Sequence, residues 1–537
     1  MRLTEQRRPS QDLWWRSGVL YQIYPRSWVD ADGDGIGDLR GIISRLDYLQ
    51  WLGIDGVWLN PVTVSPDADW GYDVSDYKGV QPVLGTLADV DELVAEAASR
   101  GIRIVFDIVP NHTSDRHPWF LDARSSRTSR HRDWYVWADP KPDGSPPNNW
   151  LSVFGGSAWT LDEHTGQYYL HNFLPEQPDL NWWNDEVRVA FDDVLRFWFE
   201  RGIAGFRIDV AHAIVKDREL RDNLPLGDDA PSELRRFGQQ RTYSMNRPEV
   251  HDVLRRWRAL CETFEPPRIL IGETYVLDLA QMAAFYGSGE DELHLAFNFP
   301  FIHSPFESAA LREVVAATEA VIPPAGWPAW TLSNHDIVRF PTRWCGGDPR
   351  KIRSALTALL ALRGTPVLYY GDELGMEQVA VPPEDARDRD PGGIRDESRS
   401  RDGARTPMPW SAERGASFTS PGATPWLPLG DDRSSNVEAQ RRDPGSVLSL
   451  CRDLIALRRG VSDLHRGDYR SLPAAGGVWA WERGESVVVA VNLSDEEGRL
   501  DGVRGVIRIG SERSRDGERV RGRLELGPWE AAIVARV

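Results

Sequence analysis

Acidic side chains recur at or shortly after short, mostly apolar stretches of this sequence, where buried strands would end. Glu273 follows the apolar run 269–272, Asp209 follows the stretch 205–208, in which Arg207 is the one charged residue, and Asp336 comes four residues after the stretch 329–332. A carboxylate buried at a strand end is costly unless it is paired or used. Two facing carboxylates are what cleavage of a glycosidic bond requires, because one acts as nucleophile or base and the other donates a proton.

Arg207 and Asp209 lie two residues apart, so in a strand their side chains point to the same face. We therefore expect Arg207 to orient Asp209 and to lower its pKa, as a neighbouring cation does. The apolar strand before Glu273 would desolvate that carboxyl and raise its pKa, which suits a proton donor near neutral pH. Taken singly, each acid has a structural alternative: an ion pair for Asp209 and Glu273, or a helix cap for Asp336. Their order on successive strands favours function.

A second acidic cluster lies near the N-terminus and consists of Asp30, Asp32, Asp34 and Asp38. Its spacing follows the start of an EF-hand loop, but the twelfth position is Gly41 instead of Glu, so it is not an EF-hand. Repulsion among four carboxylates favours a bound cation with a structural role, while the alternative is a solvated acidic turn.

The elements that must position the acids alternate between apolar strands and amphipathic helices. Eight strands are expected to start near residues 19, 56, 102, 205, 268, 295, 329 and 366. Eight strand–helix units indicate a closed (β/α)8 barrel, an α/β TIM barrel, in which chemistry lies at the C-terminal ends of the strands. We assign residues 1–110 and 182–459 to the barrel, 111–181 to a subdomain inserted after the third strand, and 460–537 to a C-terminal antiparallel β domain, a β-sandwich.

Composition narrows the partners of the protein. The 537 residues carry 63 Lys and Arg against 81 Asp and Glu, a net charge of −18. Nucleic-acid and anionic-membrane partners are therefore not expected, because both attract a basic face. No apolar run has the length of a bilayer span, and the first ten residues lack the apolar stretch of a secretory signal. With three widely spaced cysteines, expected to be buried reduced thiols, these features predict a cytoplasmic protein of undetermined oligomeric state.

Taken together, the segments around these acids resemble those of the α-amylase family of glycoside hydrolases. The matching segments are Asp107–His112, Gln177–Trp182, Gly205–Asp209, Gly272–Glu273, Asn334–Asp336 and Gly364–Glu373. The resemblance extends from about Trp14 to the C-terminus. It implies that Asp209 is the nucleophile, Glu273 the general acid/base and Asp336 a transition-state stabiliser. It also implies a covalent β-glucosyl enzyme, retention of the α-anomer, and a sugar site lined by His112, Arg207 and His335.

The resemblance also points to one group within that family. The segment Arg401–Trp410 is similar to one that α-glucosidases carry after the eighth strand. It implies that Arg405 pairs with Asp69 and closes the pocket, which permits only exo-attack. Tyr72, in the same loop as Asp69, would stack on the sugar, although a core aromatic is the alternative. The expected substrates are maltose and maltooligosaccharides, with isomaltose or sucrose as further candidates. In this group Ca²⁺ or Mg²⁺ binds at the acidic loop, with the Ile36 carbonyl as a ligand.

Linkage preference is open at this level. Val210 follows the nucleophile, a position where the oligo-1,6-glucosidase branch has Val for α-1,6 bonds and Thr for α-1,4 bonds, but one side chain changes selectivity by only about 1–3 kcal/mol. We expect α-1,4 substrates, with an oligo-1,6-glucosidase or a sucrose- or trehalose-related transglucosidase as alternatives. The segment Arg339–Arg343 lacks the acid found there in sucrose isomerases, which argues against a dedicated isomerase. A non-catalytic barrel is disfavoured because all three acids are present.

Overall fold

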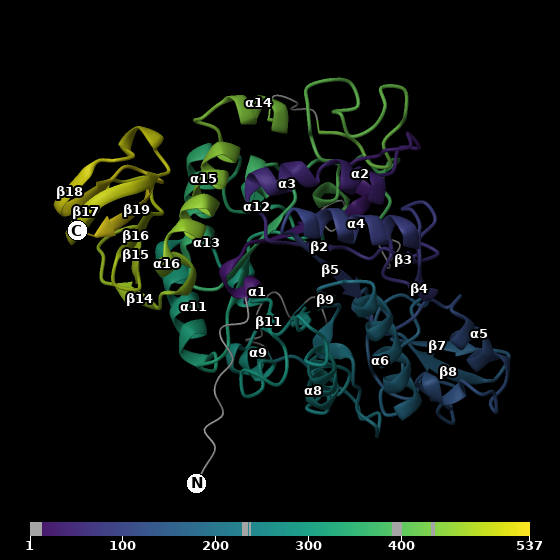
Figure 1. The fold of residues 1–537 in the computed structure, drawn as a ribbon. Helices are drawn as coiled ribbons and strands as arrows, with labels where there is room; N and C mark the ends of the chain where they lie inside the picture. Colours follow the sequence, from purple (N-terminus) through teal and green to yellow (C-terminus); the bar gives the residue numbers. More distant parts are fainter. Residues whose placement is uncertain (1–12, 228–234, 236–237, 389–399, 431–434, 537) are drawn as a thin grey trace, which may run out of the picture.

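The computed structural model describes residues 13–227, 235, 238–388, 400–430 and 435–536, and its centre is a parallel β-barrel (Figure 1). Every strand pair in its eight-stranded sheet is parallel. In the order of pairing, the strands are β11 (Leu295–Ala296), β10 (Ile269–Gly272), β9 (Gly205–Ile208), β5 (Arg103–Ile108), β2 (Gly56–Leu59), β1 (Leu20–Ile23), β13 (Thr365–Tyr369) and β12 (Ala329–Thr331). A further parallel bridge between Phe297 and Ala329 closes the ring. The eight predicted strands are thus confirmed.

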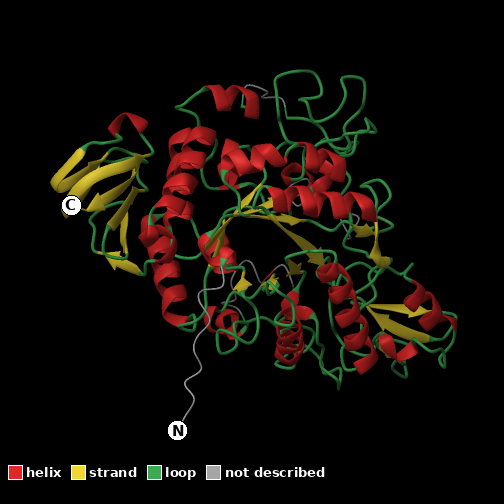
Figure 2. Ribbon diagram, in the orientation of Figure 1, coloured by secondary structure: helices red, strands yellow, loops and turns green. Residues whose placement is uncertain are grey.

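Helices surround the barrel and cover the outer faces of its strands (Figure 2). The larger ones are α3 (Leu46–Leu52), α4 (Leu87–Ser99), α6 (Asp185–Glu200), α8 (Val250–Cys261), α11 (Ser308–Val321), α13 (Pro349–Ala361) and α15 (Val447–Gly460). In α6 the buried residues Val187, Phe191, Val194 and Trp198 recur at helical spacing and form one apolar face. The strands are buried on both sides, which explains their mostly apolar sequences, in which Gln22 and Arg207 are buried polar exceptions.

The subdomain inserted after β5 has a three-stranded antiparallel sheet of its own. Its strands β6 (Trp137–Ala138), β8 (Gln167–Leu170) and β7 (Trp159–Asp162) pair in that order, and α5 (Pro118–Ser125) precedes them. The loop after β9 attaches to this subdomain, because Trp150 Nε1 donates to the Arg221 carbonyl at 2.8 Å and Asn148 Nδ2 donates to the Leu220 carbonyl at 3.0 Å. Two excursions of the barrel therefore meet near the ends of neighbouring strands.

The C-terminal β domain lies on the opposite side of the barrel from the inserted subdomain (Figure 1). Its strands form one antiparallel sheet in the order β14 (Tyr469–Leu472), β15 (Val478–Arg483), β16 (Val487–Asn492), β19 (Ala531–Arg536), β17 (Gly498–Gly510) and β18 (Arg519–Leu526). The sequence predicts a β-sandwich here. Val478 and Ala480 of β15 share a core within the domain with Leu500 and Leu524 of β17 and β18, and β17 contacts β15 although the two strands do not pair. Trp479 and Trp481, on the opposite face of β15, belong to the main core.

Two further expectations concern the whole molecule. All three cysteines are buried and free, as the sequence predicted. Among the described residues, no helix has both the length and the apolar character needed to cross a bilayer.

Candidate active site

One arginine side chain gathers three carboxylates at the C-terminal ends of β5, β9 and β10. Arg207 Nη1 lies 2.9 Å from Asp107 Oδ1 and 2.8 Å from Asp209 Oδ1, and Nη2 lies 2.7 Å from Glu273 Oε2. The sheet register places Asp107 beside Arg207, while Glu273 directly follows β10. Two candidate catalytic acids, Asp209 and Glu273, are thus held by the two arms of the same guanidinium. The side chains of Arg207 and Asp107 are almost completely buried.

The charge balance of this cluster changes one expectation. Burial raises the pKa of Asp209 well above its usual range, and the charges of Glu273 and Asp107 raise it further, which together outweigh the lowering effect of Arg207. Arg207 does lower the pKa of Asp209, as predicted, but the sequence did not show that burial and two neighbouring carboxylates would outweigh this effect, because one cation faces three carboxylates in a buried site. Burial likewise raises the pKa of Asp107 to about 6, against the opposing effect of Arg207.

The turn after Asp209 brings a backbone donor to Glu273. Val210 has φ +37°, in the left-handed region that β-branched residues rarely adopt. Its N–H donates to Glu273 Oε2 at 3.0 Å, and the next N–H, of Ala211, donates to the Glu273 carbonyl at 2.9 Å. A strained backbone conformation of this kind persists only where the surrounding contacts hold it in place, and such residues concentrate at functional sites. The Val210 side chain packs against Met245 and Phe173, so it faces the inserted subdomain.

Tyr72 and His335 join the cluster through a chain of hydrogen bonds. The Tyr72 hydroxyl donates to Asp107 Oδ2 at 2.9 Å and accepts from Asn60 Nδ2 at 2.8 Å. His335 Nε2, 2.7 Å from the same hydroxyl, must therefore be the donor, and its Nδ1 accepts from Gln22 Nε2 at 2.9 Å. Burial lowers the pKa of His335 well below its usual value, which agrees with this neutral tautomer. Tyr72 is buried and also stacks on the His335 ring at 5.3 Å.

His112 lies at the edge of the same network. Its Nε2 is 3.0 Å from the Tyr72 carbonyl, and its Nδ1 accepts from Asn111 Nδ2 at 2.9 Å. Gln177 Nε2 donates to Asp69 Oδ2 at 3.1 Å and lies 3.1 Å from His112 Nε2. Burial lowers the pKa of His112 to about 4, so the ring is neutral near pH 7. The structure thus brings together the predicted residues Asp69, Tyr72 and His112.

Two arginines compensate the charge of Asp336. Arg401 Nη1 lies 3.2 Å and Arg405 Nη2 lies 3.0 Å from Asp336 Oδ1. Arg401 Nη2 also binds Asp69 at 2.7 Å and Asp388 at 2.6 Å. Burial alone would raise the pKa of Asp336, but His335 and the two arginines outweigh it and hold that pKa below its usual range.

This arrangement corrects the predicted partner of Asp69, which is Arg401 instead of Arg405. The two arginines flank the short helix η6 (Asp402–Ala404), which directs them differently. Arg405 is turned toward the barrel, where its Nε donates to the His335 carbonyl at 2.9 Å. Arg405 therefore belongs to the site through Asp336, and the ion pair that reaches Asp69 comes from the start of the same segment.

The acidic loop near the N-terminus holds three of its four carboxylates close together. One oxygen from each of Asp30, Asp32 and Asp38 lies within 4.8 Å of the others. Asp34 lies outside this group, and its Oδ1 accepts from the Ile36 N–H at 2.7 Å. Oxygen ligands at such spacing are those that Ca²⁺ and Mg²⁺ prefer, so the chemistry of the donor set fits the predicted ion. The structure describes no contact of the Ile36 carbonyl with this group.

Three participants were missed as site residues. Asp107 was expected at the C-terminal end of the third strand but was given no role, although its place on the strand next to Arg207 could have supplied one. Arg401 was overlooked because Arg401 and Arg405 lie in one segment, and the sequence does not show which of them the turn between them directs toward Asp69. Asp388 lies in a segment without a regular pattern, and we find no signal in the sequence for it.

Comparisons with known proteins agree with this geometry. A family model described as alpha amylase, catalytic domain, matches residues 22–467. A probable alpha-glucosidase of Rhizobium meliloti is 43% identical over 91% of this chain and 90% of its own. An oligo-1,6-glucosidase of Heyndrickxia coagulans is 37% identical over 91% and 93%. Among solved structures, the alpha-glucosyl transfer enzyme XgtA has a TM-score of 0.91 at 39% identity, covering 98% of this chain and 100% of that one. A mutant of the trehalulose synthase MutB has a TM-score of 0.88 at 34% identity, covering 97% and 100%.

Proposed function

Because the chain belongs to the alpha-amylase family and is a glycoside hydrolase, we propose that it is a retaining, exo-acting α-glucosidase. It releases α-glucose from the non-reducing end of short α-glucosides and prefers α-1,4-linked substrates such as maltose and maltooligosaccharides. The observation that carries this proposal is the Arg207 guanidinium, which holds Asp209 and Glu273 side by side at the ends of neighbouring strands. Retaining enzymes need two carboxyl groups close together, about 5–5.5 Å apart.

In the proposed reaction, Asp209 attacks the anomeric carbon and forms a covalent bond as the glycosidic C–O bond breaks. Glu273 gives its proton to the departing oxygen, then takes a proton from the water that hydrolyses the glucosyl ester. Glu273 Oε2 already accepts from Arg207 Nη2 at 2.7 Å and from the Val210 N–H at 3.0 Å. Both partners are donors, so the transferred proton belongs on Oε1. The strained Val210 turn thereby selects which oxygen acts as the acid.

The ion pairs around Asp336 support exo-attack. Asp336 remains ionised between Arg401 and Arg405, so its oxygens can accept hydrogen bonds from sugar hydroxyls. Arg401 also reaches Asp69, which ties the loop after β2 to the segment after β13. We propose that the ion pairs of Arg401 with Asp69 and Asp336 close the sugar site behind the terminal glucose. A closed site accepts only a chain end.

Transglucosylation and α-1,6 cleavage are second candidates because two similar proteins are named for them. One is the alpha-glucosyl transfer enzyme XgtA, and the other is an oligo-1,6-glucosidase.

A dedicated sucrose isomerase is disfavoured by the segment after Asp336. Arg339 donates to the carbonyls of Tyr370 and Ala404, and Arg343 donates to those of Ile302 and Leu332. Both arginines therefore support the backbone instead of facing a substrate.

We also propose that the acidic loop binds Ca²⁺ or Mg²⁺ in a structural role. Asp30, Asp32 and Asp38 would hold the ion, which when bound would neutralise their mutual repulsion. Asp30 already accepts from the Thr419 hydroxyl, and its N–H donates to the Phe418 carbonyl at 2.8 Å. These contacts attach the loop to the segment after β13, so the ion would stabilise a junction between distant parts of the chain and take no part in the chemistry.

Initial rates of glucose release from maltose and isomaltose, measured side by side with products identified, test the assignment. Faster cleavage of maltose supports the α-1,4 proposal, and faster cleavage of isomaltose replaces it with the α-1,6 alternative. New oligosaccharides with little free glucose would indicate transfer. Asp209→Ala and Glu273→Gln should each lower turnover by orders of magnitude, as loss of a catalytic group does. Near-normal turnover in either variant, with the fold intact by circular dichroism, would refute the mechanism.

A further inference from the structure

A pocket lies on the outside of the barrel, away from the carboxylate cluster. It has a volume of about 480 Å³ and is formed by α3, the loop 410–417 and α14 (Val437–Arg442). Its lining residues are Arg45, Tyr48, Trp410, Ser411, Ser417, Val437, Glu438, Arg441 and Arg442. None of them touches Arg207 or the acids it holds. Pockets of about 300–1,000 Å³ are typical of small-molecule sites.

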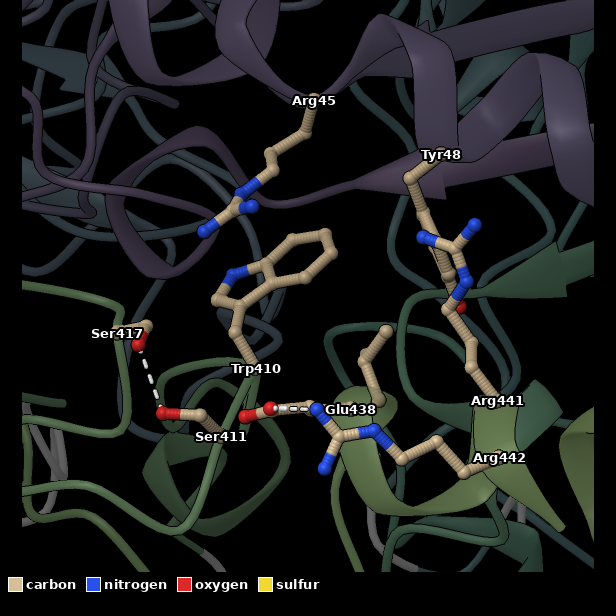
Figure 3. Close-up of a pocket in the computed structure, with 9 residues that line it drawn as sticks. Arg45, Tyr48, Trp410, Ser411, Ser417, Glu438, Arg441 and Arg442 are labelled. Atoms are coloured by element: carbon tan, nitrogen blue, oxygen red, sulfur yellow. Dashed lines mark hydrogen bonds and ion pairs between the residues drawn. The ribbon is translucent and has the colours of Figure 1, made fainter.

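Two arginines in this pocket carry charge without an acidic partner. In the described part of the chain, neither Arg45 nor Arg441 has an ion pair or a side-chain hydrogen bond, and the buried Nε of Arg45 is unsatisfied. Arg45 lies over the Trp410 ring at 4.6 Å, as Figure 3 shows, and Arg441 lies over the Trp51 ring at 4.3 Å. Burial lowers the pKa of Arg45, so its charge is held without compensation. The pocket therefore keeps positive charge although the chain has a net charge of −18.

Some charged and polar groups of this pocket are already paired within the protein, and others are free to bind a ligand. Arg442 is turned to Glu438, at 2.6 Å, and is neutralised by it (Figure 3). Ser411 and Ser417 bond to each other at 2.7 Å, so one of the two hydroxyl protons remains free to donate. Aromatic faces of Trp410 and Tyr48 meet edge to face at 5.1 Å and form the apolar part of the wall.

The wall also contains strained backbone. Ala416 and Ser417 have φ +55° and φ +53°, and they follow Gly415 at φ +81°. Two consecutive non-glycine residues in the left-handed region are unusual, and such strain concentrates at ligand sites. The turn places Ser417 opposite Ser411, where both hydroxyls line the pocket.

We propose that this pocket binds a small phosphate-bearing anion, either free phosphate or the phosphate of a sugar phosphate. Arg45 and Arg441 pair with the phosphate oxygens. Guanidinium groups suit phosphate because their planar set of donors matches its oxygens. The parts of Trp410 and Tyr48 that line the pocket would contact the sugar ring when one is attached. The volume of the pocket accommodates a monosaccharide phosphate.

Isothermal titration calorimetry of the full chain at constant ionic strength tests the proposal, with inorganic phosphate, glucose 6-phosphate and uncharged glucose as probes. We expect both phosphates to bind with heat that Arg45→Gln and Arg441→Gln each weaken about tenfold or more, the scale of a charged hydrogen bond. Arg452→Gln is the matched control, because Arg452 also stacks on Trp51 but pairs with Asp453 outside the pocket. It should bind as the wild type does.

The probes distinguish the two sources of phosphate. Equal affinities for both would mean that the site binds the phosphate group alone, and tighter binding of glucose 6-phosphate would mean that the sugar contacts the aromatic wall. Arg441 is exposed, so its replacement tests the site even if the Arg45 variant is unstable. The proposal fails if neither phosphate binds at concentrations up to about 10 mM, or if binding is unaffected by both variants. All variants should hydrolyse α-glucosides normally, which separates this outcome from the proposed catalytic function.

Discussion

Replacing Arg401 with Gln should weaken the fold and substrate use together, because this side chain compensates three acids. Its contacts with Asp69, Asp388 and Asp336 measure 2.7, 2.6 and 3.2 Å, and its side chain is 17% exposed. Removing one partner of a buried pair costs about 3–5 kcal/mol. We expect about 3 kcal/mol here, because the site is partly exposed. At about 2.1 cal/mol/K per residue, the unfolding entropy of a 537-residue chain turns this into a fall in Tm of about 3 °C.

A double-mutant cycle shows whether Arg401 or Arg405 is the partner of Asp69. Asp69→Asn and Arg401→Gln should couple by about 2 kcal/mol, the middle of the range for residues in contact, which is about 30-fold in kcat/KM. Asp69→Asn and Arg405→Gln should couple by about 0.5 kcal/mol or less, since Arg405 contacts Asp336 instead. The assay is kcat/KM for maltose, with Tm measured on each variant. A stronger coupling of Asp69 to Arg405 than to Arg401 would refute the geometry described above.

Three further changes test other parts of the structure. Asp107→Asn should move the acid limb of the pH profile of kcat/KM to lower pH, because the charge of Asp107 raises the pKa of Asp209. An acid limb at the same pH or at higher pH would contradict the interaction between Asp107 and Asp209. Asp38→Asn should lower Tm, and a chelator should lower the Tm of the wild type. Added Ca²⁺ should restore the Tm of the chelated wild type but not that of Asp38→Asn, whereas Asp34→Asn should respond to chelator and Ca²⁺ as the wild type does. Equal effects of the two substitutions on Tm would contradict the three-carboxylate site. Val210→Thr should change the ratio of maltose to isomaltose cleavage by about 10- to 200-fold, with the rates of both substrates compared. An unchanged ratio would remove Val210 from linkage choice.

The barrel was predictable because its strands are buried on both faces. Continuous apolar runs of four to six residues followed by helices leave few other folds, and even the short strand β11 was found in its place. The C-terminal domain was predicted as antiparallel β structure. Strands such as β16, whose six residues are all buried, have two covered faces. One face of β16 packs in the main core, and the other packs in the core that it shares with β17 and β18, and the sequence alone does not show which face does which.

The candidate site was predictable as a set of residues and less so as a set of contacts. Strand periodicity fixes that Arg207 and Asp209 share a face, which is why their ion pair was foreseen. The partner of Asp69 depends on a short turn between two arginines, and local patterns do not encode its direction. The pKa of Asp209 depends on how many acids converge from different strands, and that number comes only from the three-dimensional arrangement.

The same convergence gives the Arg207 cluster a constant charge through the proposed first step. Before the step, Asp209 and Asp107 are ionised and Glu273 carries its proton, so with Arg207 the cluster has a net charge of −1. When Asp209 forms the ester it loses its charge, and Glu273 gains one by releasing its proton. The negative charge thus passes from the partner of Nη1 to the partner of Nη2 within a single guanidinium. A buried site that keeps its total charge needs little reorganisation during the reaction. Burial and repulsion from Asp107, which raise the pKa of Asp209, disfavour its free carboxylate and so favour ester formation.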